Sequence, residues 1–216
     1  MKQEQFILTV FWIFGGAFVV FAYWLRRKHG REIPSRIRRI AQEHGFAGIR
    51  DRWWFGNGIR ANWQGHPIDV YFRARYKGIP ARIVTEIGVD GAPRLALKRK
   101  FGESWFQKPA ALVGPPVVDF DAAEQLWVRA DEAALAERVV RDPKIGALLD
   151  LNLVDRYDEL SLGAKQLRVQ RAIDENHLKA RNPGKNQFAL AEIAATDELP
   201  LAMAVVQALA LRPPPR

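Results

Sequence analysis

Carboxylates and histidines are the side chains in this sequence that could perform acid–base chemistry or bind a metal ion. The acids cluster in two places, Asp119 with Asp121, and Asp155 with Asp158 and Glu159. None of the histidines stands at a metal-ligand spacing such as H-E-x-x-H; they are His29, His44, His66 and His177. These acids are expected in loops or at helix starts, where capping and solvation explain them, so catalysis is the disfavoured interpretation. The sequence therefore assigns no catalytic residue and no metal site, and an enzyme is the less favoured class.

Cofactor chemistry finds no better support in the sequence. The chain contains no cysteine, which excludes disulfides, thiolate metal sites, iron–sulfur clusters and cysteine nucleophiles. Residues 55–59, FGNGI, lack the third glycine, the following helix and the Lys-Ser/Thr pair of phosphate-binding loops. No cofactor is expected.

A stretch rich in arginine and aromatic residues is the strongest candidate for a binding surface. Arginine between aromatic rings can bind carboxylate or phosphate and can stack on bases. Three interpretations stay open: an ordinary solvated sheet face, contact with anionic lipid or an acidic protein partner, and contact with nucleic acid. The candidate residues are Trp53, Trp54, Arg60, Trp63, Tyr71, Arg73, Arg75 and Arg82.

The net charge of +9 bears on the choice between these partners. Most of the excess lies in residues 26–39, where Glu32 is the single acid. A nucleic-acid-binding domain normally carries its basic patch on the folded body. Because the rest of the chain is nearly balanced, nucleic acid is the disfavoured partner.

The run from residue 6 to residue 25 carries no charged side chain and, as a helix, has the length of a bilayer's hydrocarbon core. A cleaved signal peptide is disfavoured because MKQEQ has no net side-chain charge and bulky residues follow the run. The basic residues after the run predict a single-pass inner-membrane protein with its C-terminal domain in the cytoplasm. The expected interfacial residues, with anionic lipid headgroups as their partner, are Tyr23, Trp24, Arg26, Arg27, Lys28 and Arg31.

The expected fold is α+β: a single N-terminal transmembrane helix, then an antiparallel β-meander with helices packed on one side. Period-two alternation with X-Gly turns at Gly65, Gly78 and Gly91 predicts four consecutive hairpin-connected strands. After them come a strand at 125–129, a helix capped by Asp131 and a helix from 143 to 151. A hairpin about Gly163 and a last helix capped by Thr196 or Asp197 complete the order. The segments are 1–5 outside the membrane, 6–25 spanning, 26–45 a basic collar with a short helix, 46–211 the soluble domain (meander 58–100, remainder 119–211), and 212–216 a proline-rich tail.

Two segments, FDAAEQLWVRADEAALAERVVRDPKIGALLDL and LSLGAKQLRVQRAID, carry a family resemblance over about residues 120–174. This part resembles uncharacterised bacterial membrane-anchored proteins with a cytoplasmic α+β domain. The resemblance implies a fold type and no activity. The favoured function is a non-enzymatic protein that binds or organises a partner, such as an accessory subunit of a membrane complex. The alternative is a membrane-surface enzyme acting on a lipid or envelope substrate.

Overall fold

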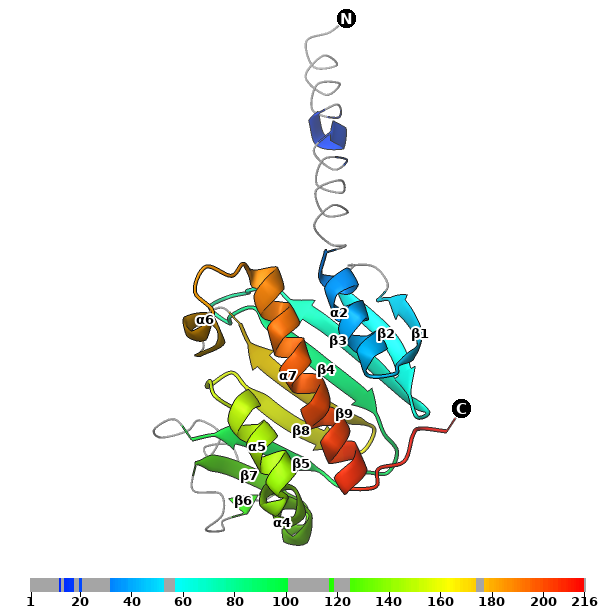
Figure 1. Cartoon of the computed structure of the whole chain (residues 1–216), viewed down its shortest axis with the longest axis vertical. Coiled ribbons are helices and arrows are strands. Elements are labelled where there is room, and N and C mark those ends of the chain that lie inside the picture. The colour runs from blue at the N-terminus through cyan, green and yellow to red at the C-terminus, as the bar shows by residue number, and fades with distance from the viewer. Residues whose placement is uncertain are drawn as a thin grey trace, which may run out of the picture.

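The computed structural model describes residues 12, 14–17, 20, 32–52, 57–100, 117–118, 125–173 and 177–215. Within these residues, nine strands form one sheet in the order β1-β2-β3-β4-β9-β8-β5-β7-β6, and every neighbouring pair is antiparallel (Figure 1). The fold is α+β.

The elements are β1 (Ala47–Asp51), β2 (Gly58–Trp63), β3 (His66–Arg73), β4 (Arg82–Gly88), β5 (Leu95–Arg99), β6 (Val117–Val118), β7 (Leu126–Ala130), β8 (Glu159–Gly163) and β9 (Gln166–Ala172). The helices are α2 (Glu32–Glu43), α4 (Ala133–Arg141), α5 (Pro143–Asn152), α6 (His177–Arg181) and α7 (Gln187–Ala208).

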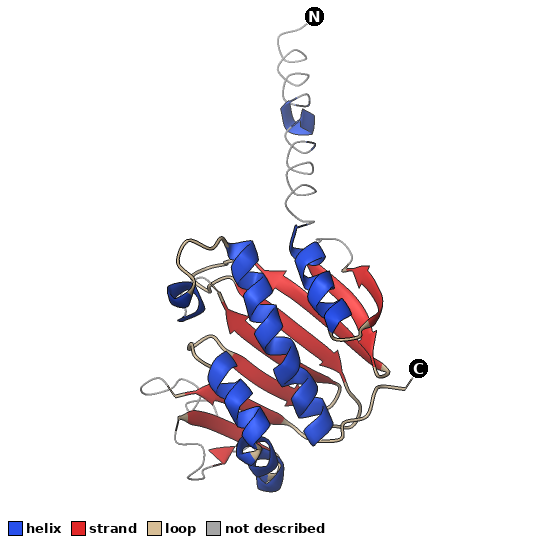
Figure 2. Ribbon diagram, viewed as in Figure 1, coloured by secondary structure: helices blue, strands red, loops and turns tan. Residues whose placement is uncertain are grey.

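Helices α2, α5 and α7 lie over one face of the sheet (Figure 2). Helix α7 crosses the middle strands β4 and β9, with α2 along one side and α5 along the other (Figure 1). The register places Ile59, Val70 and Thr85 side by side, and all three are buried on the α7 side. Because side chains alternate along a strand, the residues between them lie on the opposite face, which we call the helix-free face.

Helix α2 packs through the apolar stripe that its sequence predicts. Ile37, Ile40 and Ala41 recur at helical spacing and are buried in the core. On its flank, Arg36 pairs with Glu192 of α7 at 2.6 Å, and Arg39 pairs with the same carboxylate. Two arginines thus tie α2 to α7 alongside their apolar contact.

The predicted four-stranded meander is wrong at its last strand. β2, β3 and β4 pair in sequence order, but β5 lies between β8 and β7, separated from β4 by the β8–β9 hairpin. The backbone amides of Val89 and Ala92 donate to the carbonyl oxygens of Lys165 and Ala164 in the β8–β9 turn. The chain after β4 therefore crosses beside that turn instead of folding back on β4. Strand β1 was also missed by the sequence reasoning.

The last helix begins ten residues before the start expected from sequence. Its cap is Asn186, whose side chain accepts from the amides of Phe188 and Ala189, and Pro200 lies inside the helix. Thr196 and Asp197, taken from sequence as caps, are interior positions. The Thr196 hydroxyl donates to the Glu192 carbonyl one turn earlier in the same helix, and Asp197 accepts from the Arg171 guanidinium, so neither side chain caps a helix start.

The predicted membrane placement also requires correction. No helix within the described ranges is long and apolar enough to cross a bilayer. The structure thus contradicts the expected fold with a spanning helix and the expected single-pass location in the inner membrane. Most of 6–25, and the expected interfacial residues 23–31, lie outside the described residues.

Candidate functional site

The helix-free face carries a row of four charged side chains across four adjacent strands, with an arginine at each end and two carboxylates between them. The register places Arg60 of β2 beside Asp69 of β3, then Glu86 of β4 and Arg168 of β9. Arg60 donates to both Asp69 oxygens, at 2.7 and 2.8 Å. Arg168 Nε lies 3.8 Å from Glu86 Oε1. Each carboxylate of this row already has an arginine beside it.

Tyr71, in the next row, connects these pairs to further arginines. Its hydroxyl donates to Glu86 at 2.8 Å and accepts from Arg73 at 3.2 Å. The guanidinium of Arg52 stacks over its ring, 3.6 Å from the centroid, with its Nε 3.8 Å from Asp69. Burial, followed by the bond to Glu86, raises the pKa of Tyr71. The phenol therefore stays protonated and holds two arginines in fixed positions.

Two arginines stand directly opposite each other at the end of β3 and β4. Arg73 and Arg82 are cross-strand partners. Arg73 donates to the Tyr71 hydroxyl, and Arg82 donates to Gln170 Oε1 at 3.3 Å, so both acceptors are neutral. Burial lowers the pKa of Arg82, and the charges of Arg73 and Arg168 lower it further. This end of the face therefore has a local excess of positive charge.

The β3–β4 hairpin tip extends from the arginine pair. Lys77 and Gly78 both have positive φ, 46° and 79°, as a tight two-residue turn requires. Flanking them, Tyr76 and Ile79 exchange backbone hydrogen bonds and expose 65% and 37% of their surface. An exposed aromatic and an exposed aliphatic side chain thus adjoin the positive end of the face.

The structure separates residues that the sequence grouped together. Arg60, Tyr71, Arg73 and Arg82 share the helix-free face. Trp63 is buried in the core on the opposite face, its ring 6.1 Å from that of His66, and so cannot join a surface there. Arg75 lies exposed between β3 and the hairpin tip. Trp53 and Trp54 lie outside the described residues.

Sequence reasoning missed Arg168 and the roles of Arg52, Asp69 and Glu86. A local signal existed for Arg168, because Leu167 and Val169 are apolar on either side of it. Its position next to Glu86, however, depends on the long-range pairing of β4 with β9.

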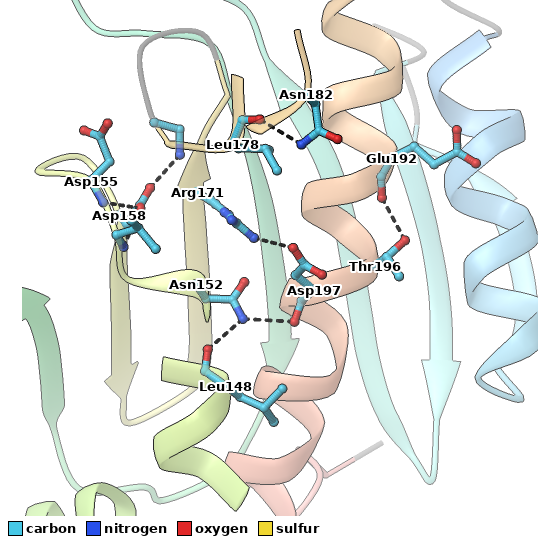
Figure 3. A network of polar contacts seen from close by, with 12 residues as sticks. Leu148, Asn152, Asp155, Asp158, Arg171, Leu178, Asn182, Glu192, Thr196 and Asp197 are labelled. Carbon is cyan, nitrogen blue, oxygen red and sulfur yellow. Dashed lines mark hydrogen bonds and ion pairs between the residues drawn. The ribbon is translucent and has the colours of Figure 1, made fainter. Parts of the chain in front are cut away.

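A second polar cluster lies between the sheet and the helices (Figure 3). Arg171 of β9, 3% exposed, donates to Asp197 of α7 at 2.6 Å. The Asn152 amide donates to the carbonyls of Leu148 and Asp197. Beside them, Glu198 is fully buried and accepts from Thr85 at 2.9 Å. Burial raises the pKa of Glu198 well above its usual value.

Asp158 belongs to the same buried region and was a candidate acid from sequence. It accepts from the amides of Val154, Asp155 and Ala172, at 2.9, 2.6 and 2.8 Å. Burial raises its pKa to about 7, although these amides favour the ionised form. The carboxylate fastens the loop before β8 to the end of β9.

The remaining candidates for chemistry add no further site. Asp119 and Asp121 lie outside the described residues. His66, buried, binds the Gly88 carbonyl at 2.8 Å through Nδ1. In the described part of the chain, no group of three or more His, Asp or Glu side chains could hold a metal ion.

Comparison with known proteins gives one distant structural likeness. No family model matches the chain, and the curated proteins give no match either. The fold is similar to the crystal structure of the mycobacterial trehalose monomycolate transport factor A, TtfA. The alignment covers 86% of this chain and 99% of that one, with 12% sequence identity and a TM-score of 0.41. Likeness at this level carries no argument about function.

Proposed function

We propose that this chain is a non-enzymatic binding protein whose helix-free face docks an acidic segment of a partner protein. The observation that carries the proposal is the composition of that face. Its carboxylates Asp69 and Glu86 are each engaged by arginine, yet Arg73 and Arg82 bind only neutral acceptors among the described residues. The face is left with positive charge that an acidic segment complements.

The fixed geometry of the face supports binding over simple solvation. Tyr71 holds Arg52 by stacking and Arg73 by a hydrogen bond. Side chains that are ordered before binding lose less entropy on association. Arginine is also among the residues enriched in those that dominate binding energy at protein interfaces.

An accessory-subunit role fits a domain of this kind. The charge of the face and the order of its side chains support the proposal.

A labelled oligoglutamate peptide tests the proposal with the intact protein. In fluorescence anisotropy we expect the protein to bind oligoglutamate and not oligoglutamine of the same length, with affinity that falls steeply as salt rises. Amide shift mapping should place the peptide on β3, β4 and β9. Equal binding of the two peptides, or shifts confined to the helices, would contradict the proposal.

The chain's overall charge requires a control. The variant Arg138→Gln/Arg141→Gln removes two exposed cations from α4, which lies on the helix-covered side of the sheet. We expect it to bind oligoglutamate as the unmodified protein does. A large loss of affinity in this variant would mean that the peptide responds to net charge alone.

A further inference from the structure

Two arginines oppose each other on the helix-free face, and no carboxylate of the described residues is hydrogen-bonded to either one. Like charges at directly opposite positions destabilise an antiparallel pair. Arg73 and Arg82 occupy such positions at the end of β3 and β4. Such an arrangement costs the free protein stability, and an anion placed between the two side chains would remove that cost.

The neighbouring acids do not fill this role. Glu86 accepts from Tyr71 at 2.8 Å and has Arg168 3.8 Å away. Burial and the repulsion from Arg73 and Arg168 lower the pKa of Arg82, and Glu159, which acts in the opposite direction, does not offset them. Arg73 and Arg82 therefore keep unused donors on a face where their charge is not balanced.

We propose that Arg73 and Arg82 form a two-arginine clamp for a single carboxylate of the partner's acidic segment. The inference rests on the proposed function and specifies its anchor point. Directly opposed residues of antiparallel strands have Cα atoms about 5 Å apart, so two guanidinium groups from these positions reach one ligand. The planar guanidinium fork matches a carboxylate with two parallel hydrogen bonds.

The surroundings of the clamp fit a protein carboxylate better than a free anion. Tyr71 and Gln170 hold one guanidinium each, so the clamp is arranged before the ligand arrives. The hairpin tip beside it exposes Tyr76 and Ile79, which offer apolar contact to residues flanking an acidic side chain. A small inorganic anion would leave these side chains unused.

Matched variants distinguish binding by the two-arginine clamp from attraction by the net charge of the protein. We expect Arg73→Gln/Arg82→Gln to weaken oligoglutamate binding about tenfold or more, whereas Arg138→Gln/Arg141→Gln, with the same charge change, loses less than about twofold. Arg73→Lys/Arg82→Lys keeps both charges and removes the planar fork, so about a threefold or larger loss is expected. Thermal melts of each variant verify that the fold is intact.

The outcomes distinguish the two proposals. If the Lys variant binds as tightly as the unmodified protein, the clamp is wrong and the pair acts only as charge. If the Gln variant also binds normally while the peptide still maps to β3, β4 and β9, the anchor lies elsewhere on the face. If the unmodified protein does not bind oligoglutamate, the proposed function itself fails. Competition by inorganic phosphate at equal concentration would overturn the selectivity for a protein carboxylate.

Discussion

The two faces of the sheet differ in how their charged side chains are paired. On the helix-covered face, Arg171 meets Asp197, and Asp158 meets three backbone amides. On the helix-free face, Arg73 and Arg82 stand side by side with neutral acceptors. The first arrangement places each of these ions beside a partner within the fold, and the second leaves the positive charge of Arg73 and Arg82 to be balanced from outside.

The cost of burying a charge explains this difference between the two faces. A buried charge must be compensated because its desolvation is expensive. A charge at a surface can remain uncompensated at small cost, so an unfavourable surface pair persists where function maintains it. Variants of the buried ion pairs on the covered face should therefore change stability most, and variants of Arg73 and Arg82 should change binding most.

The largest effect is expected at Arg171. Arg171→Met removes a buried guanidinium and leaves the partly buried Asp197 without its cation, at a cost of about 3 kcal/mol in the free energy of unfolding. Urea denaturation at neutral pH measures it. The control Arg141→Met breaks an exposed pair with Glu137 and should cost less than about 0.5 kcal/mol. Equal losses in the two variants would erase the distinction between buried and surface pairs.

The pH dependence of stability tests the buried carboxylates together. Asp158 and Glu198 both have pKa values raised by burial, so folding favours their protonated forms. The stability that they contribute is complete below their unfolded pKa of about 4 and is lost as pH rises through the folded pKa, about 7 for Asp158. Thr85 donates a hydrogen bond to Glu198, and the charges of Arg171, Asp158 and Asp197 also act on the pKa of Glu198.

Glu198→Gln isolates one of these groups, because the amide oxygen can still accept from Thr85. We expect the variant to be more stable than the unmodified protein at pH 8, by on the order of 1–2 kcal/mol, with the difference shrinking toward pH 5. Urea denaturation across this range provides the measurement. A difference independent of pH would show that Glu198 does not titrate between these values.

The fold could be predicted where local sequence carries the signal. Alternation about Gly65 and Gly78 gives β2, β3 and β4 with their hairpins, and the Gly163 turn gives β8 and β9. The position of β5 could not be obtained in this way. Its partners are set by long-range pairing with β8 and β7, which periodicity does not encode. The early start of α7 is likewise hidden, because Thr196, Asp197 and Pro200 together resemble a helix start.

The candidate site was predicted in part, for the same reason. Proximity in sequence grouped Trp63 with Arg60, although three residues along a strand place two side chains on opposite faces. Strand parity alone would have removed Trp63 from the surface. The roles of Arg168 and Gln170 depend on the pairing of β4 with β9, which no local pattern shows.

A smaller loss of stability is expected from Tyr71→Phe. The Tyr71 side chain connects the charged pairs of the helix-free face. The substitution removes the bonds to Glu86 and Arg73 and keeps the ring under Arg52. We expect a loss of about 1 kcal/mol in stability and weaker oligoglutamate binding, because Arg73 is no longer held. Denaturation and anisotropy measure the two effects. Unchanged affinity would mean that the order of the arginines does not contribute to binding.

The smallest expected effect is a gain in the stability of the free protein rather than a loss. Arg73→Gln removes one of two opposed like charges, so it should stabilise the free protein by about 0.2–1 kcal/mol at low salt. The gain should fade at high salt, where exposed charges are screened. Arg60→Gln is the matched control: it breaks a bidentate pair with Asp69 and should destabilise. If Arg73→Gln lowers the stability as Arg60→Gln does, then Arg73 stabilises the fold in the same way as Arg171. The charges of the two faces would then have the same structural role.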